Sequence, residues 1–252
     1  MSRPVMLITG GSRGIGAATA LLAAQGGYDV LINYAQDRDA AQALLARVQA
    51  LGARGLVVQA NVAIEAEVLG MFEQLDQYFG RLDVLVNNAG IVGTKSPIKD
   101  MTVARWQNMF GINILGSFIC AREAVKRMER VEAQETALNR SIVNVSSAAA
   151  RLGSPNEYVD YAASKGAMDT MTIGLAKELA AQGIRVNAVR PGLIDTDIHA
   201  SGGQPNRIEQ FKAMIPMQRG GRAEEVARAI LWLASSEASY VTGALMDVAG
   251  GR

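Results

Sequence analysis

Residues 5–16 read VMLITGGSRGIG: a short apolar run passes directly into a glycine-rich turn, and an apolar helical pattern follows. Gly10 permits a tight turn, Gly14 leaves room for a ligand to approach the backbone, and Gly16 allows the helix to pack closely on the strand. The start of the helix at Ile15 adds free N–H groups and the positive end of a helix dipole. The glycine spacing is G-x-x-x-G-x-G rather than the general G-x-G-x-x-G. The stretch therefore predicts a strand–turn–helix unit that binds phosphate.

The pattern of this first unit repeats along the chain. Short runs that are mostly continuous in apolar residues, rather than alternating, predict strands that are covered on both faces. These runs are Val5–Thr9, Asp29–Asn33, Gly55–Ala60, Asp83–Asn87, Ser141–Ser146, Arg185–Arg190 and Ala244–Val248. Segments with apolar residues at helical spacing lie between them, namely Ile15–Gln25, Ala40–Leu51, Glu65–Phe79, Val103–Arg130, Ala162–Gln182 and Glu224–Ser235. The alternation predicts an α/β protein: a single domain over residues 1–252, with a doubly wound Rossmann fold and a seven-stranded parallel sheet flanked by helices.

Composition and charge exclude several classes of protein. The chain has 252 residues, of which 49% are hydrophobic and 19% charged, so it can bury a large core. Its 25 basic and 24 acidic residues give a net charge of +1, which predicts no partner among nucleic acids or acidic membranes. No apolar stretch approaches the roughly 18 residues of a membrane span. No cluster of side chains has the spacing of metal ligands.

The single cysteine, Cys120, excludes an internal disulfide framework. It lies in an apolar helical run, which predicts a buried and unreactive thiol. This cysteine usage fits a reducing compartment, and the first apolar run is too short for the core of a signal peptide. We therefore expect a cytoplasmic protein.

The end of the second strand bears on which dinucleotide the turn would bind. Sites for NAD usually place an acidic residue there, which holds the 2′-hydroxyl of the ribose. Here the strand ends at Asn33 and is followed by Tyr34, which takes the expected place of the acid. Arg13, inside the turn, has the guanidinium geometry that suits a 2′-phosphate. Asp37 and Asp39 are interpreted as caps of the next helix. These residues favour NADP(H) over NAD(H).

A second motif, Tyr161-Ala162-Ala163-Ser164-Lys165, opens a predicted helix. The i,i+4 spacing places Tyr161 and Lys165 on one face of that helix. A phenol has a reference pKa near 10, and a nearby ammonium lowers that pKa because it favours the phenolate. On its own the pair is also consistent with an amphipathic helix surface.

Further polar signals follow other predicted strands. Ser146-Ser147 ends one strand, Asn87-Asn88-Ala89-Gly90 follows another, and Pro191-Gly192 follows a third, with Thr196 shortly after. Ligands of a doubly wound sheet bind at the carboxyl ends of its strands, which meet at one edge. We therefore expect these residues to converge with Tyr161.

Several features stand in a fixed order along the chain, namely Thr9–Gly16, Asn87–Gly90, Asn113, Ser147, Tyr161, Lys165 and Pro191-Gly192 with Thr196. Together they resemble the short-chain dehydrogenase/reductase family, over essentially the whole length. The resemblance implies an NAD(P)-dependent oxidoreductase that interconverts a carbonyl and a secondary alcohol by hydride transfer. It implies that Tyr161 is the general acid/base and that Ser147 hydrogen-bonds the substrate oxygen. Lys165 would lower the pKa of Tyr161 and hold the nicotinamide ribose, and Asn113 would position a water for proton relay.

The resemblance also implies a set of cofactor-binding residues. These are Gly10, Ser12, Arg13, Gly14, Ile15, Gly16, Asn33, Tyr34, Asn61, Val62, Asn88, Ala89, Gly90, Tyr161, Lys165, Pro191, Gly192, Ile194 and Thr196. Asn88–Gly90 would line the adenosine side, and Ile194 and Thr196 would hold the carboxamide. Asn61 departs from the family, which often has Asp there, but an amide can still hydrogen-bond adenine.

Two assignments require a choice between neighbours. We assign the substrate hydroxyl to Ser147 rather than Ser146, because alignment on Leu152-Gly153 returns Ser147. Tyr158 competes with the proposed acid/base, but Ala162 rather than a lysine stands four residues later. We therefore expect Tyr158 at the mouth of the substrate pocket.

The substrate pocket is expected to draw on Val92–Ser96, Gly153–Asp160 and a lid at about 194–222. The lid segment is rich in Gly and Pro and too long for an ordinary connection, although a decorated surface loop is the alternative. The side chains expected in the pocket are Met214, Met217, Tyr158, Glu157, Asp160 and His199. This mixed surface favours a small polar or amphipathic carbonyl compound, and His199 is interpreted as a solvated lid residue.

Within the family, the chain resembles 3-oxoacyl-carrier-protein reductases and glucose 1-dehydrogenases. Gln182 falls where the former often have Arg, and Lys126-Arg127 is interleaved with Glu129 and Glu132, which counts against an acidic carrier protein as partner. Two other classes stay open: a sensor that binds dinucleotide without catalysis, and a dehydratase or epimerase on the same fold. Members of the family commonly pack their long helices into tetramers, so we expect a homotetramer.

Overall fold

The structure, a computed structural model, describes residues 3–129, 139–196, 202–204 and 206–252. Its central sheet has seven parallel strands in the order β3-β2-β1-β4-β5-β6-β9. They are β1 (Val5–Ile8), β2 (Asp29–Tyr34), β3 (Gly55–Gln59), β4 (Val84–Asn87), β5 (Arg140–Val145), β6 (Ile184–Pro191) and β9 (Leu245–Val248). Each corresponds to a predicted strand, and the ends differ only by the margin usual for strand boundaries. The predicted parallel, doubly wound α/β sheet is confirmed.

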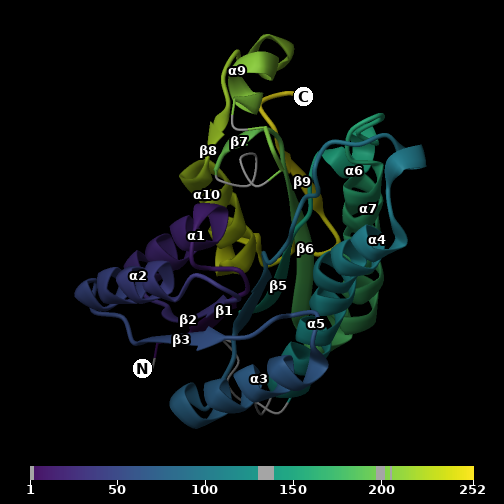
Figure 1. Cartoon of the computed structure of the whole chain (residues 1–252). Helices are drawn as coiled ribbons and strands as arrows, with labels where there is room; N and C mark the ends of the chain where they lie inside the picture. Colours follow the sequence, from purple (N-terminus) through teal and green to yellow (C-terminus); the bar gives the residue numbers. More distant parts are fainter. Residues whose placement is uncertain (1–2, 130–138, 197–201, 205) are drawn as a thin grey trace.

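Helices cover both faces of this sheet (Figure 1). One layer contains α1 (Gly14–Gln25), α2 (Arg38–Ala50) and α10 (Ala223–Ala234). The other contains α3 (Glu65–Phe79), α4 (Val103–Phe110), α5 (Gly116–Met128) and α7 (Val159–Leu179). Among the residues described, no helix has both the length and the apolar character needed to cross a membrane.

The strands are mostly apolar because each of their faces is covered. Successive side chains of a strand point to opposite faces of the sheet. In β1, Met6 and Ile8 belong to the same buried cluster as Ala20 of α1, whereas Leu7 belongs to the cluster that contains Phe72 of α3. All of these side chains are fully buried. Burial on both faces explains why the sequence shows continuous apolar runs rather than alternation.

The order of the strands reverses at β1, which places a crevice at its carboxyl end. Leu7 is paired with Leu31 of β2 on one side and with Leu85 of β4 on the other. The chain runs outward from β1 through β2 to β3 and then returns to β4 on the opposite side. Such a reversal leaves room for a ligand beyond the strand ends.

The predicted helix Val103–Arg130 is not one regular helix. α4 ends at Phe110, a π-helical segment covers Gly111–Leu115, and α5 then begins at Gly116. A Cβ on Gly116 would lie 2.7 Å from Cγ2 of Val62, so the chain passes too close to the loop after β3 for a side chain. The wider turn of the π segment lies at the position of the predicted site residue Asn113, which is a common place for such bulges.

Several small elements were not predicted from the sequence. They are α6 (Ala149–Leu152), α9 (Arg207–Phe211) and a two-stranded parallel sheet formed by β7 (Ile194–Asp195) and β8 (Gly221–Arg222). β7, α9 and β8 belong to the segment 194–222 that was expected to form a lid. Figure 1 shows them above the carboxyl ends of the central strands. Residues 197–201 and 205 of that segment lie outside the described residues.

Candidate active site

Two adjoining cavities lie at the carboxyl ends of the central strands. The first has a volume of about 360 Å³ and the second of about 510 Å³. Some residues line both of them, namely Ile15, Asn88, Gly90, Val92 and Thr196. Because the linings overlap, one extended ligand can occupy the second cavity and reach into the first.

The glycine-rich turn forms one wall of the second cavity. Gly10 has a φ of +58°, a left-handed conformation that favours glycine. A Cβ on Gly10 would lie 2.8 Å from Cα of Ala89, so the two backbones meet too closely for a side chain. α1 begins at Gly14, and no side chain caps its first N–H groups. This bare backbone at the positive end of a helix fits the phosphates of a dinucleotide.

Asn88, just after β4, ties the turn to the neighbouring strand. Its Nδ2 donates hydrogen bonds to the carbonyl oxygens of Thr9 and Gly10, both at 2.9 Å. Oγ1 of Thr9 accepts from the backbone N–H groups of Asn88 and Ala89, both at 3.0 Å. A Cβ on Gly16 would lie 2.6 Å from Nδ2 of Asn88 and 2.6 Å from the Gly10 oxygen. Any side chain at Gly16 must therefore displace the turn or the amide that holds it.

The amide of Asn33, at the end of β2, supports the same turn from the other side. Its Oδ1 accepts from the N–H of Gly10 at 3.1 Å, and its Nδ2 donates to the carbonyl oxygen of Ala60 at 2.9 Å. Asn33 lines the second cavity, but it is 1% exposed and its amide is engaged by the backbone. The structure therefore gives Asn33 a supporting position behind the turn.

The rim of the second cavity carries a cation and no acid at the position that NAD sites usually fill. Tyr34 lines the cavity and is 6% exposed. Asp37 caps α2, because its Oδ1 accepts the N–H of Ala40 at 2.9 Å, which confirms the predicted cap. Arg13 lies exposed at the rim, and its side chain makes no hydrogen bond or ion pair with another residue that the structure describes. Its guanidinium is available for a negatively charged group.

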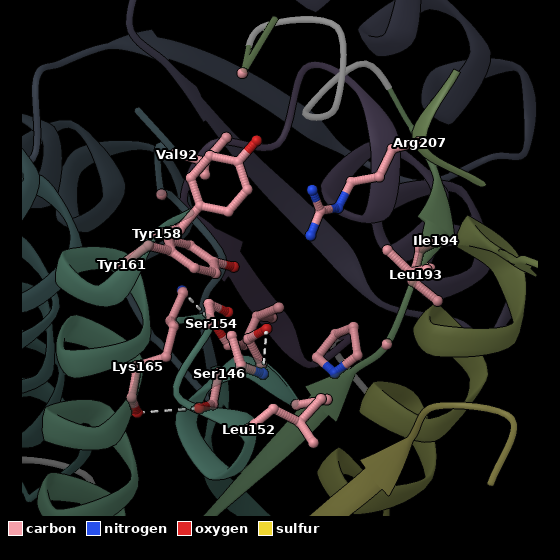
Figure 2. A pocket seen from close by; sticks show the side chains of 18 of the residues that line it. Val92, Ser146, Leu152, Ser154, Tyr158, Tyr161, Lys165, Leu193, Ile194 and Arg207 are labelled. Atoms are coloured by element: carbon pink, nitrogen blue, oxygen red, sulfur yellow. Dashed lines mark hydrogen bonds between the residues drawn. The ribbon is translucent and has the colours of Figure 1, made fainter. Parts of the chain in front are cut away.

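Ser147, Tyr161 and Lys165 all line the first cavity, and Figure 2 shows Tyr161 and Lys165 there. Ser147 lies just beyond the end of β5, and Tyr161 lies in the first turn of α7. The Ser147 hydroxyl lies close enough to the Tyr161 phenol for hydrogen bonding to lower the pKa of that phenol. Oγ of Ser147 also accepts the N–H of Ala149 at 3.1 Å. Because this oxygen already accepts from the backbone, its own proton is free to be donated into the cavity.

Lys165 lies one helical turn after Tyr161 and is 3% exposed. Its Nζ donates to the carbonyl oxygen of Val145 at 2.8 Å and lies 3.3 Å from Sδ of Met168. The same nitrogen is 5.7 Å from the centre of the Tyr161 ring. Burial lowers the pKa of Lys165 to about 8, and the negative charge of Asp169 opposes this shift.

Burial is the main influence of the protein groups on the pKa of Tyr161, and the lowering expected beside Lys165 and an oxidised nicotinamide stays a prediction. Burial raises the pKa of the phenol, and the hydrogen bond with Ser147 opposes this only in part. The Lys165 ammonium lies 5.7 Å from the centre of the Tyr161 ring and donates to the carbonyl oxygen of Val145. The protein groups alone therefore hold Tyr161 as a neutral phenol at neutral pH, and a stable phenolate requires a further positive charge nearby.

Asn113 is fully buried in the π segment and lines neither cavity. Its Nδ2 donates to the carbonyl oxygen of Ile91 and to Oγ of Ser164, both at 3.0 Å, and its Oδ1 accepts the N–H of Ile91 at 2.8 Å. The Ser164 hydroxyl donates to the carbonyl oxygen of Tyr161 at 2.7 Å. The Asn113 side chain thus joins the cavity wall to the first turns of α7, and its role in positioning a water stays a prediction.

The other residues expected to bind the dinucleotide are brought together as well. Those that line the second cavity are Gly10, Ser12, Arg13, Gly14, Ile15, Asn33, Tyr34, Asn61, Val62, Asn88, Ala89, Gly90 and Thr196. Those that line the first are Pro191, Gly192 and Ile194, with Tyr161 and Lys165. Gly16 lies behind the turn and lines neither cavity.

The substrate side of the first cavity contains an arginine that the sequence reasoning missed. Arg207 of α9 lines this cavity and faces Tyr158 and Tyr161 across it in Figure 2. Its Nη2 lies 2.6 Å from Oε2 of Glu157, and its Cζ is 5.0 Å from the centre of the Tyr158 ring. Tyr158 lines the cavity and is 5% exposed, as expected for the pocket mouth. No local pattern relates Arg207 to Glu157, because the two lie far apart in the chain.

Several side chains expected in the substrate pocket lie elsewhere. Met214 and Met217 are 63% and 60% exposed and line no part of the first cavity, so their prediction was wrong. Both methionines come after α9 in the sequence, and their apolar character alone did not show that their side chains face solvent. Asp160 is buried in an ion pair with Arg105 and does not line the cavity either. His199 lies outside the described residues.

Cys120 is buried and unpaired with another cysteine. Burial raises the pKa of its thiol to about 12, and the nearby charge of Glu123 acts in the same direction. The thiol is therefore protonated at neutral pH, as predicted. Within the described parts of the chain, no group of three or more His, Cys, Asp or Glu residues could hold a metal ion.

Residues 10–252 match the sequence family described as enoyl-(acyl carrier protein) reductase. A protein of Escherichia coli strain K12 named uncharacterized oxidoreductase YgfF is 54% identical over 248 residues, which cover 98% of this chain and 99% of the relative. The likeness therefore extends over the glycine-rich turn and over both cavities.

Solved structures with dinucleotides are also similar. A 3-ketoacyl-(acyl-carrier-protein) reductase from Brucella melitensis, complexed with NADH, has a TM-score of 0.90 and 31% identity and covers 99% of this chain and 98% of that chain. A short-chain dehydrogenase from Burkholderia cenocepacia J2315, in complex with NADP, has a TM-score of 0.89 and 32% identity and covers 99% and 97%. Relatives with the same fold thus include one bound to NADH and one bound to NADP.

Proposed function

Because the chain belongs to the short-chain dehydrogenase/reductase family, we propose that it uses NADP(H) to interconvert a carbonyl and a secondary alcohol, with Tyr161 as the acid/base. Membership makes the chain an NAD(P)-dependent oxidoreductase. One observation supports the finer proposal most strongly: Tyr161, Ser147 and Lys165 line a single cavity that adjoins the one fitting a dinucleotide.

The residues that line the second cavity would hold a nicotinamide dinucleotide, which would supply the hydride for reduction of the carbonyl carbon. Tyr161 supplies the proton to the carbonyl oxygen, because burial keeps its pKa raised and its phenol protonated at neutral pH. Ser147 donates a hydrogen bond to the same oxygen, since its Oγ already accepts from Ala149. The two hydroxyls together stabilise the negative charge that develops on that oxygen.

Lys165 stabilises the tyrosinate that remains after the proton is transferred. With a pKa of about 8 it is mostly charged at neutral pH, and the carbonyl of Val145 holds its ammonium in place. In the oxidative direction the same tyrosinate accepts the proton of the alcohol. Asn113 holds the first turns of α7 against the wall at Ile91, which keeps Tyr161 and Lys165 in register.

The preference for NADP(H) rests on the rim of the second cavity. Arg13 is exposed there and forms no ion pair with a described residue, so its guanidinium can receive a 2′-phosphate in the two-point geometry that arginine provides. Tyr34 occupies the place where an acidic residue would bind the 2′-hydroxyl of NAD and repel a phosphate.

The substrate that the first cavity suits best is a small carbonyl compound rather than an acyl chain on an acidic carrier protein. A carrier protein needs unpaired basic residues beside the active site. Arg127 of α5 is 10% exposed and is bonded to Asp76 and Glu123, and Lys126 is bonded to Glu123 as well. The basic pair of α5 is thus neutralised within this chain.

The proposal includes a homotetramer in the cytoplasm, with the whole chain acting as one catalytic domain and 194–222 as its lid. Exposed apolar side chains gather on the α4–α5 region and supply a surface for packing between subunits, namely Val103, Phe110, Leu115 and Phe118. A single buried, reduced Cys120 is consistent with a reducing compartment.

The proposal is tested by following NADPH oxidation with diacetyl, a β-keto ester and acetoacetyl-CoA, beside the same acyl group on a carrier protein. We expect turnover of at least one small carbonyl compound, and no advantage for the carrier-bound form. NADPH binding without turnover of any of them would support a sensor instead. Conversion of a hydroxy or epimerisable compound without net NADPH consumption would support a dehydratase or epimerase.

A further inference from the structure

Arg105 of α4 and Asp160, the residue before Tyr161, form a buried ion pair. Nε of Arg105 lies 2.6 Å from Oδ2 of Asp160, and Nη2 lies 3.1 Å from Oδ1. The Asp160 side chain is 1% exposed and the Arg105 side chain 16% exposed. Two parallel hydrogen bonds fix the guanidinium and the carboxylate in one relative orientation. The pair therefore joins the first turn of α4 rigidly to the first turn of α7.

The same guanidinium holds the loop that follows β4. Nη1 of Arg105 donates to the carbonyl oxygen of Thr94. Gly93 lies directly against it, because a Cβ there would be 2.6 Å from Cζ of Arg105. The preceding residue, Val92, lines both cavities, and Figure 2 shows it on the same side of the first cavity as Tyr161. Arg105 thus fixes the stretch of cavity wall beside Tyr161.

Asp160 also binds the backbone of Tyr161. Its Oδ1 accepts the N–H of Tyr161 at 2.9 Å. This N–H belongs to the first turn of α7, where backbone N–H groups have no partner within the helix. A single carboxylate therefore holds both the arginine that fixes the wall and the residue whose phenol faces the cavity.

Stability alone is a weak reason for this pair, since replacing a buried ion pair with apolar residues is often neutral or stabilising. Neither Arg105 nor Asp160 lines a cavity. We propose that the Arg105–Asp160 pair is a positioning device that sets the Tyr161 phenol against the Val92 wall at the distance proton transfer needs. This inference rests on the proposed function of Tyr161. The position of the phenol strongly affects the reaction rate, because a displacement of about 1 Å at a reacting group costs about 100-fold in rate.

The test compares Asp160→Asn and Arg105→Lys with a matched control, Asp83→Asn. Asp83 is also a buried carboxylate that pairs with an arginine, at 2.6 Å from Nη2 of Arg81, and that accepts a backbone N–H, from Val5 at 2.7 Å. It lies just before β4, at the opposite edge of the sheet from the cavities. Each protein is measured for thermal unfolding, NADPH binding, and kcat and KM with NADPH and diacetyl, or with acetoacetyl-CoA if diacetyl is not turned over.

We expect kcat to fall about 10- to 100-fold in Asp160→Asn and Arg105→Lys, while KM for the carbonyl and the Kd for NADPH stay within about threefold. Asp83→Asn should lose a similar amount of thermal stability but keep kcat within about threefold. Where Asp160→Asn does not fold, Arg105→Lys carries the same expectation, because it retains the charge but loses the two-point geometry and the guanidinium bond to Thr94.

Amide hydrogen exchange tests the positioning role of the Arg105–Asp160 pair independently of the proposed function. Exchange should rise at residues 92–94 and 160–162 in Asp160→Asn and stay unchanged there in Asp83→Asn. If the unmodified protein reduces no carbonyl compound, the proposed function fails while this measurement still reports on the positioning. Unchanged exchange at these residues, an unchanged kcat in folded Asp160→Asn, or an equal loss of kcat in Asp83→Asn would overturn the inference.

Discussion

The Lys165 ammonium lies 5.7 Å from the centre of the Tyr161 ring, and the carbonyl oxygen of Val145, at the end of β5, fixes it at 2.8 Å. The pKa values of these two side chains shift in opposite directions. Burial raises the pKa of Tyr161 and lowers that of Lys165 to about 8. A neutral phenol beside a charged amine suits proton donation to a carbonyl oxygen at neutral pH.

Lys165 should make the folded protein more stable as the pH rises above about 8. Its folded pKa of about 8 lies below the ordinary 10.5, so the unfolded chain binds more protons between these values. Stability then increases with pH across that window, by about 3 kcal/mol in total. Urea unfolding at several pH values between about 7.5 and 9.5 should show about 2 kcal/mol of this rise, and Lys165→Met should flatten it. Equal pH dependence in the two proteins would show that Lys165 is not a destabilised cation.

Gly16→Ala should disturb the turn and weaken NADPH binding. The added methyl group would lie 2.6 Å from Nδ2 of Asn88 and from the Gly10 oxygen, and overpacking of this kind typically costs about 1–3 kcal/mol. We expect at least about a tenfold rise in the Kd for NADPH, measured by fluorescence titration. Gly70→Ala in α3 is the control, because its Cβ would meet nothing within 4 Å. The free energy of unfolding of Gly70→Ala should rise by about 0.5–1 kcal/mol, and this variant should bind NADPH normally. Weaker NADPH binding in both variants would contradict this account of the turn.

Arg13→Ala should change the choice of dinucleotide. The exposed guanidinium at the rim is proposed to bind the 2′-phosphate, so its loss should raise the Kd for NADPH about 10- to 100-fold and leave that for NADH within about threefold. Arg47→Ala, another exposed arginine on the neighbouring helix α2, controls for general charge effects. Equal losses for both dinucleotides in Arg13→Ala would remove the basis for an NADP(H) preference.

Much of the fold could be predicted because it depends on local pattern. Val84-Leu85-Val86 in β4 is a continuous apolar run, as burial on both faces of a parallel sheet favours. The glycine-rich turn could also be predicted from the sequence, since the positive φ of Gly10 and the close approach at Gly16 restrict those positions to glycine. The convergence of Ser147 and Tyr161 followed from topology, because both lie at the carboxyl edge of the sheet.

Other features depend on contacts that no local pattern encodes. The π segment at Gly111–Leu115 has the same apolar composition as a regular helix, so periodicity did not show it. The Arg105–Asp160 pair joins residues far apart in sequence. The place of Arg207 in the first cavity was not predicted either, because its partner Glu157 is also distant in sequence. The direction of the Tyr161 pKa shift depended on the depth of burial of the phenol, which only the packed structure supplies.

The most direct test of the account is the turnover of Tyr161→Phe, measured as NADPH oxidation with whichever carbonyl compound the unmodified protein reduces fastest. Tyr158→Phe is the matched control, because Tyr158 lines the same cavity three residues earlier. We expect Tyr161→Phe to lose about 10²- to 10⁴-fold in kcat while its Kd for NADPH stays within about threefold, and Tyr158→Phe to keep most of its activity. Full activity in Tyr161→Phe, or an equal loss in Tyr158→Phe, would contradict the assignment of Tyr161 as the acid/base.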